Sequence, residues 1–216
     1  MAKNHQIIQA ALGIYPVNAA CHKLPDNFPL PVEKFDLAAE LSFIREQAMK
    51  QHIIAIGECG LDGHWLGPET YAKQEFIFEK LLEIAMDSNL PVIIHSRKLE
   101  KRVIEILTTY GTKKVNFHCF GGKTKLALQV AERFGWSFSI PAIAHKNQAF
   151  SKLLKDLPAQ SILTETDCPY LSPTKNTRNE PSNVLHTVAL LASIRDWTLN
   201  QAKETIWHNF QRLFNF

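Results

Sequence analysis

Residues 52–57 read HIIAIG and residues 91–95 read PVIIH, and these two short runs indicate the fold class. Each run is apolar at nearly every position, so a strand built from it is buried on both faces. Such strands are typical of parallel sheets covered by helices. Helical patterns lie before and after both runs. This alternation predicts an α/β fold, either an open doubly wound sheet or a (β/α) barrel.

The same alternation continues along the rest of the chain. Apolar residues at helical spacing, such as Phe35, Leu41 and Ile44, predict the first helix. A Pro-rich stretch at 24–32 precedes it and predicts a long loop. The expected strands are 6–14, 52–57, 91–95, 114–118, 136–140 and 161–166, and the expected helices are about 32–50, 68–89, 98–110, 123–134, 147–157, 181–194 and 199–214.

Length and composition indicate one globular domain over residues 1–216. The chain has 216 residues, of which 45% are hydrophobic and 21% are charged, and its formal charge is +3. These values exclude a disordered or coiled-coil chain, and the charge is too small to indicate nucleic-acid binding by itself. No signal peptide and no apolar run of about 18 residues is recognisable, so we expect a cytoplasmic protein without membrane contact.

Four of the six expected strands end on a side chain that can bind a metal ion. Glu58 and Asp167 directly follow their strands, whereas His95 and His118 end theirs. The carboxyl ends of parallel strands form the active-site edge of α/β folds. Two imidazoles and two carboxylates suit Zn²⁺, Mn²⁺ or Fe²⁺, and also Mg²⁺ where positions stay open. Each residue alone is also explained as an ordinary strand-end or turn residue, but together they favour a metal site.

Three cysteines directly follow three of these residues. They are Cys59, Cys119 and Cys168, and with Cys21 they form no CxxC pair, which argues against a zinc ribbon or a thioredoxin-type site. Successive side chains of a strand face opposite ways. We therefore expect reduced thiols that serve packing, not metal ligation.

Four basic residues lie in or near the loops after the strands. Arg97, Lys123 and Arg178 are candidates for binding a phosphate group of the substrate, and His64 is a candidate substrate contact. The alternative for each is a solvated surface residue, and the sequence does not decide between the two. No Gly-rich phosphate loop follows any strand, which argues against a nucleotide cofactor.

Five ordered motifs around these residues resemble the signatures of the TatD family of metal-dependent DNases. They are IGECGLD at 56–62, LPVIIHSR at 90–97, FHCFGG at 117–122, ETDCPYLSP at 165–173 and RNEPSN at 178–183. The resemblance runs from about residue 7 to residue 216. It implies a TIM-type (β/α) barrel of the amidohydrolase kind, and hydrolysis of DNA phosphodiester bonds, commonly as a 3′→5′ exonuclease.

The resemblance also implies roles for the strand-end residues. Glu58 would bridge two divalent metal ions, and His95 and His118 would hold one of them. Asp167 would bind the other ion and orient the attacking water. The expected cofactor is Mg²⁺, Mn²⁺ or Zn²⁺, with one or two ions per chain.

The sequence departs from the family pattern at its start. TatD-type proteins open with a strand that ends in a His-x-His pair, and no such pair occurs in the sequence. GIYP at 13–16 stands where the family has GIHP. We therefore expect an N-terminally shortened domain that begins at the family's third strand and forms about six of the eight strands of a closed barrel.

The shortening has two expected consequences. The second metal ion would keep only Glu58 and Asp167 as ligands and would bind weakly. The strands at 6–14 and 161–166 would have open edges, which predicts association with a second copy or with a complementing fragment.

Three functional hypotheses remain at this point. The first is a TatD-type deoxyribonuclease with DNA as its substrate. The second is a catalytically impaired remnant, or a scaffold that depends on a partner for the rest of the metal site. The third, ranked last, is a hydrolase of a cyclic amide or lactone, because the sequence offers no strand-end Lys that could bridge metals after carboxylation.

Overall fold

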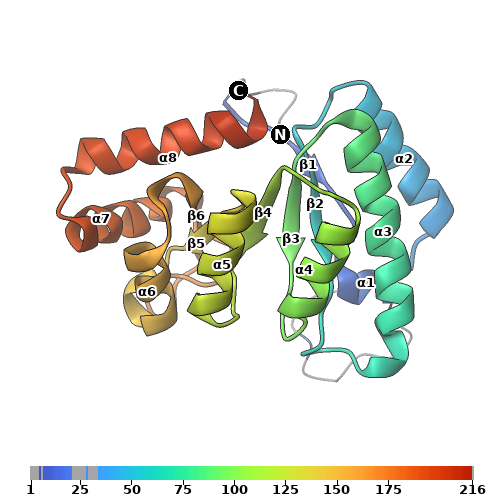
Figure 1. The fold of residues 1–216 in the computed structure, drawn as a ribbon, viewed down its shortest axis with the longest axis horizontal. Coiled ribbons are helices and arrows are strands. Elements are labelled where there is room, and N and C mark those ends of the chain that lie inside the picture. Colours follow the sequence, from blue (N-terminus) through green and yellow to red (C-terminus); the bar gives the residue numbers. More distant parts are fainter. Residues whose placement is uncertain (1–4, 6, 21–27, 29–33, 216) are drawn as a thin grey trace. The chain divides into compact units, whose positions relative to one another are not determined.

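Strands and helices alternate along the chain as the apolar pattern predicts. The computed structural model describes residues 5, 7–20, 28 and 34–215. The chain divides into two compact units, Met1–Val115 and Asn116–Phe216. In each unit, parallel strands pair side by side and helices lie beside them (Figure 1). The predicted α/β class is therefore confirmed.

The first unit holds the strands β1, β2 and β3. Its elements are β1 (Ala11–Leu12), α1 (Pro16–Ala20), α2 (Leu37–Met49), β2 (Ala55–Gly60), the 3₁₀ turn η2 (Pro68–Thr70), α3 (Tyr71–Ser88), β3 (Val92–His95) and α4 (Glu100–Thr109). β2 pairs in parallel with both β1 and β3. Ile56 of β2 and Ile94 of β3 are fully buried, as the two apolar runs predict.

The second unit is organised around β5, which pairs in parallel with β4 and β6. Its elements are β4 (Val115–His118), α5 (Thr124–Phe134), β5 (Ser137–Pro141), η3 (Ala144–Lys146), α6 (Gln148–Asp156), η4 (Ala159–Ser161), β6 (Ile162–Glu165), η5 (Pro181–Asn183), α7 (Val184–Arg195) and α8 (Leu199–Phe214). Phe117 stacks on Phe138 with ring centroids 5.2 Å apart, and Phe120 packs edge-on against Phe138 at 5.3 Å. These rings form an aromatic core under the strands.

The first strand is much shorter than the sequence predicts. Only Ala11 and Leu12 pair with β2, although an apolar run from residue 6 was expected to form the strand. Residue 6 lies outside the described residues, and Ile7 is 93% exposed. A strand needs a neighbouring strand to pair with as well as apolar residues, and the pairing with β2 covers only two residues.

The second strand begins and ends three residues later than expected. β2 runs from Ala55 to Gly60, so Glu58 lies inside the strand and does not follow it. The register against β3 shifts between Ile56 and Cys59, which is the mark of a β-bulge. Pairing with β3 continues to the partners Gly60 and His95. The end of β2 is therefore set by its neighbour, not by its own composition.

The helix α2 begins later than the expected residue 32, and its first turn explains why. The Asp36 carboxylate accepts hydrogen bonds from the N–H groups of Ala38 and Ala39 at 2.9 and 3.1 Å. This N-cap satisfies donors that a helix start leaves open. The expected loop at 24–32 lies outside the described residues apart from Phe28. Within the described ranges, no helix is long and apolar enough to cross a membrane.

Candidate functional site

The first unit brings Glu58 and His95 into direct contact at the carboxyl ends of β2 and β3. His95 Nδ1 lies 2.8 Å from Glu58 Oε1, and His95 Nε2 lies 2.8 Å from Asp62 Oδ2. The Asp62 side chain is fully buried, whereas a third of the Glu58 side chain is exposed. Burial acts to lower the pKa of His95, but the two carboxylates outweigh it and raise that pKa. The ring is thus held between a buried carboxylate and an accessible one.

Asp62 also shapes the loop that follows β2. Its Oδ1 accepts hydrogen bonds from the N–H groups of His64 at 2.7 Å and Trp65 at 2.6 Å. Burial acts to raise the pKa of Asp62, but the contact with His95 and these N–H donors lower it overall. The backbone of Asp62 is fixed in turn by the buried Gln74, which accepts from its N–H at 2.7 Å and donates to its carbonyl at 3.0 Å.

The second unit repeats this arrangement around His118. Nδ1 of His118 lies 2.8 Å from Glu165 Oε2, and Nε2 lies 3.7 Å from Asp167 Oδ1. Ser139 Oγ also donates to Glu165 Oε2. Glu165 Oε1 is buried and makes no hydrogen bond within the described part of the chain. Burial raises the pKa of Glu165, although His118 and Ser139 act against it.

The loop that carries Asp167 is fastened by a single buried side chain. Nδ2 of Asn179 donates to the carbonyl oxygens of Thr166, Tyr170 and Leu171, at 2.6, 2.7 and 3.2 Å. Asn179 is 1% exposed. This network fixes the path of the chain on both sides of Asp167 and so determines where its carboxylate points.

The donor chemistry of both pairs fits a divalent metal ion. Histidines that bind metals usually have their other ring nitrogen held by a carboxylate or carbonyl, and Asp62 and Glu165 hold His95 and His118 in this way. The 3.7 Å between His118 Nε2 and Asp167 Oδ1 is too long for a hydrogen bond. It is close to the separation of two ligands that each lie about 2.1 Å from one ion. Within the described residues, no group of three or more His, Cys, Asp or Glu side chains has metal-binding geometry.

Sequence reasoning missed three of the residues that shape these pairs, namely Asp62, Glu165 and Asn179. Each lies inside a motif already noted. Glu165 is an acidic residue within the last two positions of the expected strand 161–166. That strand-end position could have identified Glu165. Asp side chains often accept hydrogen bonds from backbone N–H groups of the loop that follows them. That tendency could have identified Asp62.

The four candidate substrate-binding residues divide between the units. In the first unit, His64 and Arg97 both lie against the ring of Trp65, with the His64 ring centroid 4.7 Å and the Arg97 guanidinium carbon 5.7 Å from the ring. In the second unit, Lys123 precedes α5 and Arg178 precedes Asn179, and both are exposed. Of the four candidates, the structure therefore brings His64 and Arg97 together on one aromatic ring.

The three described cysteines have different environments. Cys59 is fully buried, its Sγ lies 3.7 Å from the Ile93 carbonyl oxygen, and burial raises its pKa. Cys119 is half-buried, and Cys168 is exposed. The expected packing role is therefore wrong for Cys168. The chain leaves β6 at Glu165, so the alternation of a strand does not extend to residue 168.

Gly60 lies at the close approach of β2 to His95, and we expect Gly60→Ala to be strongly destabilising. Its φ is +138°, and a Cβ atom there would lie 2.0 Å from the carbonyl oxygen of His95. Backbone strain of this kind alone costs about 1–3 kcal/mol. Chemical denaturation should therefore show a loss larger than that of Gly135→Ala, whose φ is +70° with no atom within 4 Å. Equal losses in the two variants would contradict the close approach.

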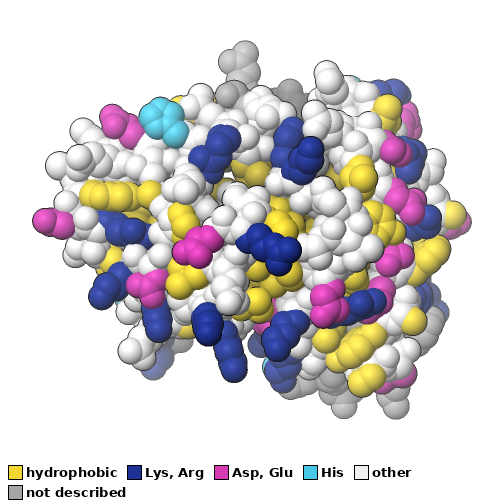
Figure 2. All heavy atoms as spheres, in the orientation of Figure 1, with side chains coloured by type: hydrophobic (Ala, Val, Ile, Leu, Met, Phe, Trp, Pro, Cys, Tyr) yellow, Lys and Arg dark blue, Asp and Glu magenta, His cyan; other side chains and the backbone are white. Residues whose placement is uncertain are grey.

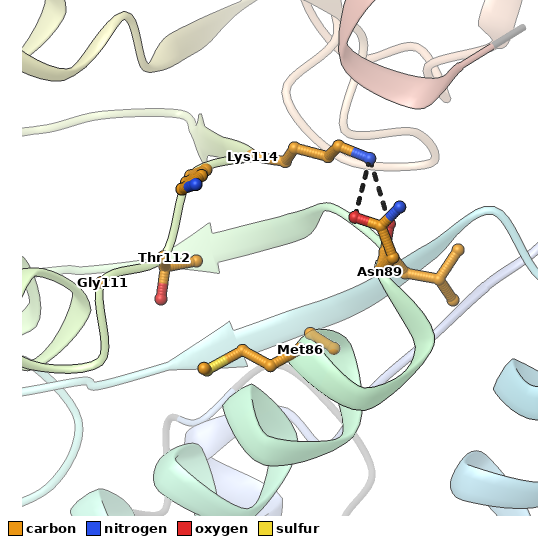
Figure 3. Close-up of a pocket in the computed structure, with 8 residues that line it drawn as sticks. Met86, Asn89, Gly111, Thr112 and Lys114 are labelled. Atoms are coloured by element: carbon orange, nitrogen blue, oxygen red, sulfur yellow. Dashed lines mark hydrogen bonds between the residues drawn. The ribbon is translucent and has the colours of Figure 1, made fainter.

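Two cavities lie away from these pairs. One, of about 240 Å³, is lined by Ala85, Met86, Asn89, Leu90 and residues 111–114, and it lies beside the end of α3 and the start of β3 (Figure 3). Lys114 donates there to both oxygens of Asn89. Another, of about 360 Å³, lies between α6 and Ile194 of α7. Lys and Arg side chains gather over α5 and α6 in the same unit (Figure 2). No predicted site residue lines either cavity.

Comparison with known proteins points to one family. The family model described as TatD related DNase matches residues 1–215. The chain is 35% identical to the uncharacterized metal-dependent hydrolase MJ1582 of Methanocaldococcus jannaschii over 75% of its own length and 63% of that protein's length. It is 34% identical to the human deoxyribonuclease TATDN3 over 94% of its own length and 73% of that protein's length.

A solved structure gives the same result for the fold. The crystal structure of YjjV, a TatD homolog from Escherichia coli K12, superimposes with a TM-score of 0.82 at 22% identity, over all of this chain and 80% of that one. The likeness confirms an α/β fold of the TIM-barrel type, with six strands in the described part of this chain.

Proposed function

The chain belongs to the TatD related DNase family, and from that premise we propose that it is a metal-dependent hydrolase that cleaves DNA phosphodiester bonds, releasing nucleotides from a 3′ end. The observation that carries the proposal is the repeated pairing of a histidine with an accessible carboxylate. Glu58 lies against His95, and Asp167 faces His118. In both pairs a second carboxylate, less exposed than the first, holds the other ring nitrogen.

In this proposal divalent ions, Mg²⁺, Mn²⁺ or Zn²⁺, are held by Glu58 and His95 in the first unit and by His118 and Asp167 in the second, with one or two ions per chain. Bound ions of this kind stabilise charge on phosphoryl oxygens and lower the pKa of a water molecule. Asp62 and Glu165 keep the imidazoles oriented, so that Nδ1 of His95 and Nε2 of His118 remain directed at the accessible carboxylates.

The carboxylate of Asp167 acts as the base in this scheme. Its side chain is 35% exposed, so water reaches it, and Asn179 fixes the loop that carries it. A carboxylate in this position accepts the proton of the attacking water and orients its lone pair. Arg97, Lys123 and Arg178 carry positive charge and are exposed, so in this scheme they bind phosphates of the DNA strand, and the exposed His64 is a further substrate contact.

The test is nucleotide release from single-stranded DNA by the purified 216-residue chain, with Mg²⁺ or Mn²⁺ and with EDTA. We expect release that needs the metal ion, disappears with EDTA, and is lost in Glu58→Gln. Asp87→Asn is the matched control, because Asp87 is an exposed carboxylate whose ion-pair partner is Arg45.

Two results would count against the proposal. Release that survives EDTA would exclude a required metal ion, and release that survives Glu58→Gln would remove Glu58 from the machinery. A folded chain that releases nothing with any divalent ion would favour the impaired remnant or partner-dependent scaffold. β1 and β6 each pair with one neighbouring strand within the described residues. Association with a second copy or a complementing fragment through these edges stays a prediction.

A further inference from the structure

The loop after β2 places an indole ring beside a guanidinium group. The Arg97 guanidinium carbon lies 5.7 Å from the centre of the Trp65 ring, a distance typical of a cation–π contact. The His64 ring meets Trp65 edge-on at 4.7 Å, and Phe28 does so at 5.2 Å. Trp65 is half-buried, whereas Arg97 is exposed. A planar group can therefore reach the guanidinium from solvent.

This cluster is held at a fixed place relative to His95. The Trp65 N–H donates to Asp62 Oδ1 at 2.6 Å, and the other oxygen of Asp62 contacts the His95 ring at 2.8 Å. The Gly63 N–H donates to the Arg97 carbonyl oxygen at 2.9 Å. The loops after β2 and β3 are thus bonded to each other, and one buried carboxylate joins the indole segment to the histidine.

The same cluster holds two adjacent cations. Lys98 directly follows Arg97 in the chain, and burial together with the charges of these two residues lowers the pKa of His64. Lys98 is exposed, as are His64 and Arg97. Proteins bind unpaired nucleotides with this combination, in which a base stacks on an aromatic or guanidinium plane and cations bind the phosphate.

We propose that the Trp65–Arg97 pair is the subsite for the terminal base of an unpaired DNA end. The proposal rests on the proposed nuclease function and adds a determinant of substrate choice to it. The base stacks on the guanidinium that covers the indole, and Lys98 with the edge of Arg97 binds the adjacent phosphate. A base inside a duplex cannot stack in this way, so single-stranded or frayed ends are preferred over blunt ends.

The experiment compares two oligonucleotides that differ only at the 3′ terminus, one ending in a normal nucleotide and one in an abasic residue. Trp65→Leu removes the ring that supports the stacked guanidinium, so we expect kcat/KM on the normal strand to fall about 5- to 150-fold, the range for loss of one stacking contact with a base, mainly through KM. On the abasic strand the variant and the wild type should be equal. Trp65→Phe should retain most of the preference, because it keeps a ring.

The chain offers a matched control in another cation–aromatic pair. Lys80 Nζ lies 5.8 Å from the ring centre of Phe76, which is 52% exposed on α3. Phe76→Leu should therefore leave kcat/KM unchanged on both the normal and the abasic strand. Since Trp65 is half-buried, Arg97→Met supplies a second variant at an exposed position, and it should lose the same preference. Equal losses on the normal and abasic strands, or no loss on either, would overturn the proposal.

A binding measurement keeps this proposal separate from the proposed function. Fluorescence anisotropy of a labelled single strand, measured with EDTA present, does not require turnover. The wild type should bind the normal strand more tightly than the abasic strand, and Trp65→Leu should remove that difference. If the wild type releases no nucleotides but binds the normal strand more tightly than the abasic strand, the nuclease function fails and the base subsite stands. If release is observed without the difference, the subsite fails alone.

Discussion

Asp167→Asn should release nucleotides about 10²- to 10⁴-fold more slowly than the wild type, the range for loss of a positioned acid–base group. The amide matches the carboxylate in size, but it neither accepts a proton nor carries the negative charge that a divalent ion attracts. Asp167 Oδ1 faces His118 Nε2 at 3.7 Å, so the substitution acts where the metal and the attacking water are proposed to bind. Steady-state kinetics at saturating metal measures the effect.

The fold of Asp167→Asn should be intact, because the side chain is 35% exposed and its loop is held by Asn179. An unchanged melting temperature, with Asp87→Asn as the activity control, would separate a chemical effect from an unfolding effect. Full activity in Asp167→Asn would exclude this residue as the base.

Asp62→Ala should lower the free energy of unfolding by about 3–5 kcal/mol, the range for breaking a buried ion pair from one side. The substitution leaves Nε2 of His95 and the N–H groups of His64 and Trp65 without their acceptor. Urea denaturation measures the loss. Asp87→Ala is the control, because an exposed ion pair contributes less than about 1 kcal/mol. Similar losses in the two variants would show that Asp62 does not hold His95.

The isosteric variant Asp62→Asn separates orientation from stability. A partner that orients a metal-binding histidine typically contributes about 10- to 100-fold to metal affinity, so binding of Mn²⁺ should weaken by that factor. Because the folded pKa of Asp62 is lowered, its contribution to stability is present above its ordinary pKa of about 3.9 and is lost as the pH falls below it. The stability difference from the wild type should therefore narrow in acid.

The strands that the sequence predicts best are the buried ones with sharp boundaries. The strands expected at 91–95, 114–118 and 136–140 match β3, β4 and β5 to within one residue at each end. Their apolar runs are bounded by turn residues, so the local sequence is sufficient to predict where these strands begin and end. β1 and β2 differ because their extents depend on which residues of a neighbouring strand are available for pairing, and one sequence does not contain that information.

The candidate site shows the same division between local and tertiary information. The strand-end pattern singles out Glu58, His95, His118 and Asp167, and the structure brings Glu58 against His95 and Asp167 near His118. It does not reveal that Asp62 and Glu165 are buried behind the two rings, because burial depends on packing between elements. Their metal-binding and positioning roles stay predictions until the variants are measured.

The carboxylate of Asp62 has a thermodynamic consequence. One oxygen accepts from the segment that carries Trp65, and the other contacts His95, so the same carboxylate restricts both. Two binding events that both restrict one shared group are linked, and linkage is reciprocal. If a divalent ion strengthens the binding of a DNA end by some factor, the DNA end must strengthen the binding of that ion by the same factor. Weakly held metal would then be retained best while substrate is bound.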